Sequence, residues 1–225
     1  MLDLRTFSKL GTRFLRPPDH LQRTLGGIRG LLFDCDGVFN DGWKDADGGS
    51  PFSEVDSMGV NLLRFGMWLA NKQLPVCAVI TGQHNPQAQR FAEREHLHAI
   101  YMGFTHKMDA LERFRSDHGC DDKQVAFFFD DVLDLPLARR CGMRILVHQP
   151  ASPLFENFVS ARLDADLLTH LNGGRHGLRE ACELLLGLMG RYEEVVEHRL
   201  RYSDMYKAYL ADRNAVPTEV VKNPR

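Results

Sequence analysis

Short apolar runs alternate with amphipathic segments along most of the chain. Between the runs, Asn85 followed by Pro86 is typical of a helix start, and Gly119 and Gly142 are placed to end two further helices. Strands separated by helices of this length predict an α/β fold, a doubly wound parallel sheet with helices on both faces. The runs are rich in β-branched and aromatic residues and predict strands at 28–33, 75–80, 99–102, 124–129, 144–147 and 166–169.

Two segments depart from this alternation. Residues 43–55 are rich in glycine and aspartate and contain the turn sequence DADGGS, so we expect a β-hairpin that projects from the end of the first strand. After Gly190 the apolar residues repeat with the helical period, which predicts one amphipathic helix packed on its own domain or on a neighbouring subunit. The chain is therefore divided into an N-terminal arm (1–27), a core domain (28–190) and a helical tail (191–225).

The composition narrows the class of protein. With 44% hydrophobic and 26% charged residues, the 225-residue chain matches a soluble globular protein. Its net charge of −2 gives no support for a nucleic-acid partner, and no apolar run approaches the roughly 20 residues that span a bilayer. The five cysteines are scattered and odd in number, which favours reduced thiols in the cytoplasm over disulfides or a zinc site.

Polar side chains follow four of the predicted strands at their carboxyl ends, where open α/β sheets bind ligands. Carboxylates of this kind suit Mg²⁺, and a hydroxyl, an ammonium and the N–H groups of a tight turn suit phosphate oxygens. Each residue alone is more often a helix cap or a surface charge, but the set in this order favours a catalytic site. In chain order the set is Asp34 and Asp36, then Thr81 and Gly82, then Lys107, then Asp130, Asp131 and Asp134.

Two other phosphate-handling classes fit less well. A response-regulator receiver domain uses similar residues, but its phosphorylated aspartate follows a later strand and its lysine comes last. A nucleotide-binding P-loop is excluded because no GxxxxGK sequence occurs.

The order DxDG, TG, K and DDxxD resembles the haloacid dehalogenase (HAD) superfamily of phosphohydrolases. Within it, DCDGVFNDG, AVITGQ, HKMDAL, FDDVLDLP and GGRHGLRE resemble, in order and spacing, the 3-deoxy-D-manno-octulosonate 8-phosphate phosphatase family over residues 28–190. The resemblance implies a HAD-like sheet without a large cap domain and a cytoplasmic enzyme of lipopolysaccharide biosynthesis. It also implies a homotetramer in which hairpin and C-terminal segments cover active sites across subunits.

The same resemblance implies roles for individual residues. Asp34 would be the nucleophile that forms an aspartyl-phosphate, and Asp36 would be the general acid and then the general base. Thr81, with Gly82 beside it, and Lys107 would bind the phosphoryl group.

The resemblance also implies a metal and a substrate contact. Mg²⁺ would be held by Asp34, the backbone carbonyl of Asp36, and Asp130, with Asp131 or Asp134 supporting these ligands. Arg175, within GGRHG, is the candidate to bind a substrate carboxylate. The alternative is that Arg175 lies at a helix start and forms an ion pair with a neighbouring acidic residue.

The chain departs from the family pattern in three places. Phe129 stands where the family has glycine, and would either crowd the backbone beside the metal or enter the core. The sequence DSMG at 56–59 replaces RDG, and Gln83 replaces an arginine, so positive charge near the substrate is reduced. We expect a Mg²⁺-dependent phosphatase of a small phosphorylated sugar or sugar acid. The alternatives are another phosphorylated metabolite, such as an acylneuraminate 9-phosphate, or a non-catalytic regulatory subunit.

Overall fold

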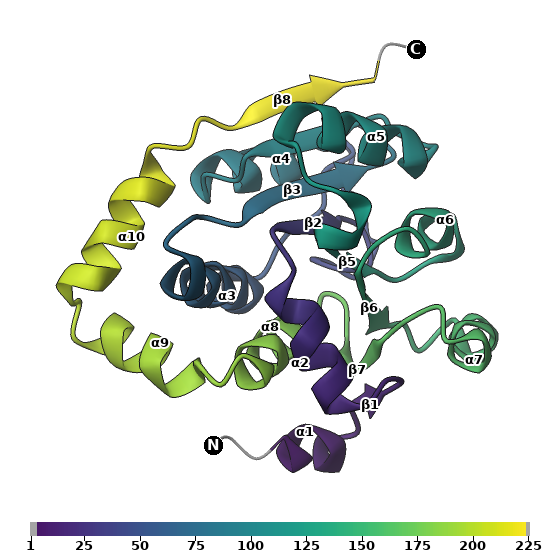
Figure 1. Ribbon diagram of the computed structural model, residues 1–225. Coiled ribbons are helices and arrows are strands. Elements are labelled where there is room, and N and C mark those ends of the chain that lie inside the picture. Colours follow the sequence, from purple (N-terminus) through teal and green to yellow (C-terminus); the bar gives the residue numbers. More distant parts are fainter. Residues whose placement is uncertain (1–3, 224–225) are drawn as a thin grey trace.

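Eight strands form a single sheet in the computed structural model, which describes residues 4–223 (Figure 1). Their order across the sheet is β1-β7-β6-β5-β2-β3-β4-β8, and all neighbours are parallel except β1 and β7. The six strands predicted from the sequence are confirmed as β2 to β7. The strands are β1 (Arg13–Phe14), β2 (Gly30–Asp34), β3 (Val76–Thr81), β4 (Ala99–Met102), β5 (Val125–Phe129), β6 (Met143–His148), β7 (Leu167–Asn172) and β8 (Glu219–Lys222).

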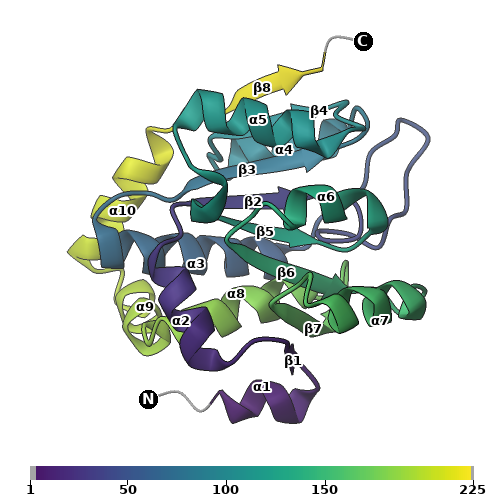
Figure 2. The ribbon, with the colours of Figure 1, turned by 45° about the vertical axis from the view of Figure 1, so that its right-hand side comes forward.

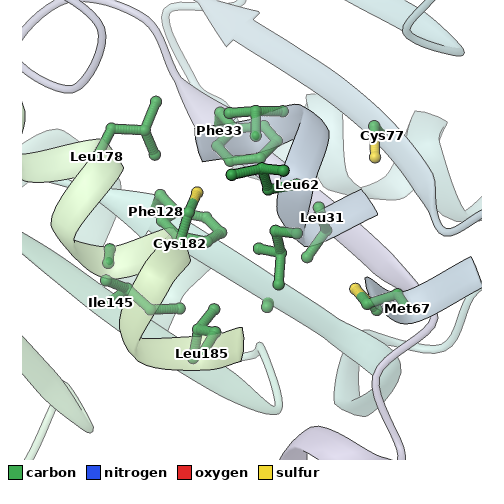
Figure 3. Packing of buried hydrophobic residues seen from close by; sticks show 14 of the residues in the cluster. Leu31, Phe33, Leu62, Met67, Cys77, Phe128, Ile145, Leu178, Cys182 and Leu185 are labelled. Carbon is green, nitrogen blue, oxygen red and sulfur yellow. The ribbon is translucent and has the colours of Figure 1, made fainter. Parts of the chain in front are cut away.

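Helices cover both faces of the sheet, as expected for a doubly wound α/β fold (Figure 2). Buried residues of α3, α4 and α8 share one core with strand residues such as Phe33 and Phe128 (Figure 3). Those of α5, α6 and α7 share a second core with Leu32 and Phe129. The helices are α1 (Arg5–Leu10), α2 (Pro18–Gly26), α3 (Glu54–Asn71), α4 (Pro86–Arg94), α5 (Lys107–His118), α6 (Leu135–Ala138), α7 (Pro153–Arg162), α8 (Gly177–Leu188), α9 (Tyr192–Leu200) and α10 (Asp204–Asn214).

Two of the three predicted helix ends are confirmed. The Asn85 side chain accepts a hydrogen bond from the Ala88 N–H (3.0 Å) at the start of α4, and Gly119 ends α5 with a φ of 65°. The third differs, because α6 is a single turn that finishes before Gly142. The Gly142 N–H donates instead to the carbonyl of Val125 (3.0 Å), which ties the next strand to β5.

The predicted hairpin is replaced by a loop over residues 41–53, which extends past the carboxyl ends of the strands (Figure 2). The expected turn is present, since the Asp45 N–H donates to the Gly49 carbonyl (2.8 Å). Strands do not continue from it because Pro51 has no N–H to pair, and Lys44 and Ser50 direct their side chains to Asp36.

The C-terminal tail contains two helices where the sequence predicts one. The break falls at Tyr202, whose φ is 46°, and Ser203 then caps α10 by accepting from the Tyr206 N–H (3.3 Å). The apolar stripe packs on the chain's own domain: Tyr209 is buried, and its ring centroid lies 5.0 Å from that of Phe65 in α3.

Both terminal segments join the sheet. The arm supplies β1, which pairs with β7, and the tail supplies β8, which pairs with β4. Among the residues described, no helix combines the length and the apolar character needed to cross a membrane.

Candidate active site

The site lies where the direction of strand order reverses, between β2 and its neighbour β5. Asp34 is the last residue of β2, and Asp130 directly follows β5. Together with Asp134 they form a cluster in which one carboxylate oxygen from each residue lies within 4.8 Å of the other two. We call Asp34, Asp130 and Asp134 the acid cluster.

Lys107, the first residue of α5, is ion-paired with two members of the acid cluster. Its Nζ lies 2.6 Å from Asp34 Oδ1 and also donates to Asp134 Oδ1. Burial alone would lower the pKa of Lys107, but the two carboxylates outweigh that effect and raise it. The lysine is therefore a fixed positive charge at the back of the site.

Asp130, the third member of the acid cluster, forms no ion pair with another described residue. Its Oδ1 atom is buried and has no hydrogen-bond partner among the described residues. Burial and the nearby Asp34 and Asp134 carboxylates raise the pKa of Asp130 to about 9, and burial with Asp34 raises that of Asp134 to about 7. Burial raises the pKa of Asp34 as well, although Lys107 opposes the shift.

A hard divalent cation fits this arrangement. Three carboxylates converge while one lysine compensates only two of them, so a cation would remove the cost of ionising the third. Carboxylate oxygens with room for water and phosphate ligands are the donors that Mg²⁺ prefers.

Asp36 lies beside the acid cluster and is held by the loop over 41–53. Its carboxylate is ion-paired with Lys44 and accepts hydrogen bonds from Ser50 Oγ (2.9 Å) and Asn40 Nδ2 (3.3 Å). The side chain is 29% exposed, so it can reach a molecule bound above the sheet.

Thr81 is the last residue of β3, on the other side of β2, and Gly82 follows it. Thr81 is buried, and its backbone carbonyl accepts from the N–H groups of Gly103 (3.0 Å) and Phe104 (3.3 Å). The ends of β3 and β4 are thus tied together, and the chain runs on from Phe104 to Lys107.

Asp131 and Asp134 point to different surroundings. Asp131 is exposed, and its Oδ1 accepts from the N–H of Val132 (2.6 Å) at the start of the 3₁₀ turn Val132–Asp134. That turn brings Asp134, three residues later, back to Lys107. The DDxxD spacing was the sequence signal for this arrangement. It left open whether Asp131 or Asp134 supports the metal ligands.

Arg175 lies on the exposed loop before α8, where it lines a pocket of about 240 Å³ with Asn40, Asp41 and Ser53 among others. No ion pair links it to another described residue. The Arg175 guanidinium is therefore free to bind an anion. The alternative role, an ion pair with a neighbouring acidic residue, is not seen among the described residues.

Two of the departures from the family pattern, Phe129 and Asp56, have structural explanations. Phe129 is fully buried and enters the core, where its ring stacks on Phe127 with centroids 5.7 Å apart. It does not crowd the backbone beside the acid cluster. Asp56 is also fully buried, and its Oδ1 accepts from the N–H of Arg179 (2.9 Å) in the first turn of α8.

No protein-family model matches the chain. Among curated proteins it is similar to the 3-deoxy-D-manno-octulosonate 8-phosphate phosphatase KdsC of Salmonella typhi, with 29% identity over 175 residues, 78% of this chain and 88% of the relative. The KdsC of Yersinia pestis is 28% identical over 172 residues, 75% of this chain and 84% of the relative.

Solved structures give the same picture. A Legionella pneumophila structure described as a HAD superfamily (subfamily III A) hydrolase has a TM-score of 0.67 at 28% identity, covering 81% of this chain and 95% of that one. The Yersinia pestis 3-deoxy-D-manno-octulosonate 8-phosphate phosphatase has a TM-score of 0.63 at 26% identity, covering 78% and 89%. The Moraxella catarrhalis phosphatase, solved with magnesium, phosphate and KDO, has a TM-score of 0.65 at 23% identity, covering 80% and 97%, a likeness of fold alone.

Proposed function

We propose that the chain is a hydrolase of the HAD superfamily, similar to 3-deoxy-D-manno-octulosonate 8-phosphate phosphatases, and that it removes phosphate from a small phosphorylated sugar acid of this kind. The observation that carries the proposal is the acid cluster with Lys107 at the reversal point of the sheet. It supplies a nucleophile, a cation site and a fixed positive charge in one place.

Mg²⁺ would be held by Asp34, Asp130 and the backbone carbonyl of Asp36. The buried, unpartnered Oδ1 of Asp130 supports this assignment. When bound, Mg²⁺ neutralises charge on the phosphate and orients its oxygens for attack. Asp134 would act by holding Lys107, and Asp131 by stabilising the turn that positions Asp134.

Asp34 would carry out the first half of the reaction. Its carboxylate is fixed by Lys107, so one oxygen can attack phosphorus in line with the sugar oxygen that leaves. The new bond joins Asp34 to the phosphoryl group as the bond from phosphorus to the sugar breaks. Thr81, Gly82 and Lys107 would bind the phosphoryl oxygens.

Asp36 would move the protons. It would donate one to the leaving alkoxide, then accept one from the water that hydrolyses the aspartyl-phosphate, which restores Asp34 and releases phosphate. The contacts from Asn40 and Ser50 would hold the Asp36 carboxylate in reach of both positions. From the sequence resemblance, Arg175 is a candidate to bind a substrate carboxylate.

Two alternatives remain as proposals of lower rank. An acylneuraminate 9-phosphate is also a phosphorylated sugar acid and would use the same residues. The second alternative is a non-catalytic subunit, and Phe129, which could have crowded the metal site, was the one residue in its favour. Because the Phe129 ring is buried in the core, it gives this alternative no support.

We also propose a cytoplasmic homotetramer. Exposed apolar side chains lie at the carboxyl edge of the sheet, among them Trp43 (75% exposed) and Leu133 (65% exposed). Contacts between subunits would cover such residues.

The test is phosphate release in the presence of Mg²⁺ from a panel of sugar phosphates. The panel contains 3-deoxy-D-manno-octulosonate 8-phosphate, acylneuraminate 9-phosphates, and common hexose and pentose phosphates, each run beside Asp34→Asn. We expect turnover of a sugar-acid phosphate that the variant abolishes. Turnover of neutral sugar phosphates alone, or equal activity in Asp34→Asn, would contradict the proposal.

A further inference from the structure

An open pocket of about 540 Å³ lies beside the candidate active site, at the carboxyl ends of β3 and β4. A volume of this size is within the range of about 300–1,000 Å³ found for small-molecule sites. Six residues line it: Gln83, His84, Met102, Gly103, Lys222 and Asn223.

Two walls of the pocket continue directly from the residues proposed to bind phosphate. Gln83 follows Thr81 and Gly82 in the chain, and the Gly103 N–H donates to the Thr81 carbonyl. A substrate whose phosphate is held at Thr81 and Lys107 therefore has this pocket within reach of its carbon chain.

The third wall comes from the C-terminal tail of the same chain. Strand β8 pairs with β4 so that Lys222 lies opposite Met102. Asn223 closes the ladder, since its N–H donates to the Met102 carbonyl (2.9 Å) and its Nδ2 donates to the Gly103 carbonyl (3.3 Å).

The tail that leads to β8 is anchored on α3. Trp68 Nε1 donates to Asp212 Oδ2 (2.7 Å), and Arg213 donates to Asn61 Oδ1 (2.9 Å). The backbone position of Lys222 is thus set by the fold.

Lys222 gives the pocket its charge. It is the one lining residue with a permanent charge, it is exposed, and no carboxylate of the described chain is ion-paired with it. Gln83 adds a neutral amide. A pocket with an ammonium and amide donors and no acid fits a ligand that carries a carboxylate and hydroxyl groups.

We infer that β8 completes the substrate pocket in cis and that Lys222, rather than Arg175 in its separate pocket, binds the carboxylate of the phosphorylated sugar acid. This inference rests on the proposed function for the position of the phosphate. Strand β8 would then determine substrate selectivity. Lys222 would bind the carboxylate of the substrate, and the acid cluster would act at its phosphate.

The test is equilibrium binding of the phosphate-free sugar acid 3-deoxy-D-manno-octulosonate, measured by calorimetry on the full chain with Mg²⁺. We expect Lys222→Met to raise Kd about three- to tenfold, Lys222→Glu to raise it further, and Lys222→Arg to restore most of the affinity. Lys9→Met, which removes a lysine from α1, is the matched control and leaves Kd unchanged. Equal Kd values for wild type and Lys222→Met, or no binding to wild type, would overturn the inference.

Kinetics separate this inference from the proposed function. With 3-deoxy-D-manno-octulosonate 8-phosphate as substrate, Lys222→Met raises KM by a similar factor and changes kcat less than about twofold, because the lysine contacts a part of the substrate that does not react. A chain that binds the sugar acid through Lys222 but releases no phosphate would refute the proposed function alone. A chain that releases phosphate with the same KM in Lys222→Met would refute this inference alone.

Discussion

The carboxylate of Asp130 fills the space in which a side chain on residue 37 would begin. A Cβ built on Gly37 would lie 1.9 Å from Asp130 Oδ2, and the backbone of Gly37 has a φ of 90°, a conformation that favours glycine. The glycine after Asp36 thus allows an acid from a different strand to approach the end of β2.

We expect Gly37→Ala to displace Asp130 and to abolish both Mg²⁺ binding and phosphate release. Gly42→Ala is the matched control, since Gly42 has a similar φ of 83° but a Cβ there would meet no atom within 4 Å. Both variants carry the backbone cost of about 1 kcal/mol, measured by denaturant unfolding. Only Gly37→Ala should lose the stabilisation by Mg²⁺, and an equal loss in both would refute the role of Asp130.

Stabilisation by Mg²⁺ should increase with pH. The pKa values of Asp130 (about 9) and Asp134 (about 7) lie above the ordinary value of about 3.9, so the metal-free fold binds protons more tightly than the unfolded chain. The contribution of these two carboxyl groups to the stability of the metal-free fold therefore falls as pH rises from about 4 through 7 to 9. Because Mg²⁺ replaces those protons, the rise in Tm on adding it should be larger at pH 8.5 than at pH 6.

Asp130→Asn provides the control for that experiment. The amide cannot ionise, so the metal-free variant should keep more of its stability at pH 8.5 than the wild type, and should gain little from Mg²⁺. A Tm rise in the variant equal to that of the wild type would remove Asp130 from the metal site.

Replacing Phe129 by glycine should damage the fold and leave turnover no better. The ring is fully buried against Phe127, and its removal leaves a cavity that costs about 3–5 kcal/mol. Phe129→Leu, which keeps most of the volume, should lose less than about 2 kcal/mol in denaturant unfolding. A large gain in kcat for Phe129→Gly would instead show that the ring obstructs the site.

Acid should destabilise the protein through His98. Burial, with Arg64 and His118 nearby, lowers the pKa of His98 to about 4, and its Nδ1 accepts from the Cys77 N–H (3.1 Å). The fold thus prefers the neutral ring, and the stability that His98 contributes falls by roughly 2–3 kcal/mol as pH falls from about 6.5 to 4. His98→Gln should remove this contribution from the dependence of unfolding free energy on pH in this range, whereas the exposed control His84→Gln should leave the dependence as in the wild type.

The strands, and most of the residues that the structure brings together at the candidate site, were predictable because they depend on short-range patterns. The apolar run before Asp34 and the polar residues after four such runs need no knowledge of distant contacts. The face to which Phe129 points was not predictable, because buried parallel strands read as continuous apolar runs and Phe127, Phe128 and Phe129 are alike in sequence.

Other features depend on a few backbone torsions. A single 3₁₀ turn decides that Asp134, rather than Asp131, faces Lys107. A positive φ at Tyr202 breaks the tail helix, and the only sequence signal for it was the capping pair Ser203 and Asp204. The edge strand β1 has two residues, too few to give a pattern.

The pairing of β8 with β4 also has a consequence for how the chain is made. Edge strands expose unpaired backbone groups that can recruit other chains, and domains begin to fold while synthesis continues. The edge of β4 stays open until residues 219–222 have been synthesised and have emerged from the ribosome. A ribosome that stops shortly before Glu219 would release a chain with every member of the acid cluster but with a fully buried strand newly exposed as a template for aggregation. Strand β8 thus protects this protein from misassembly.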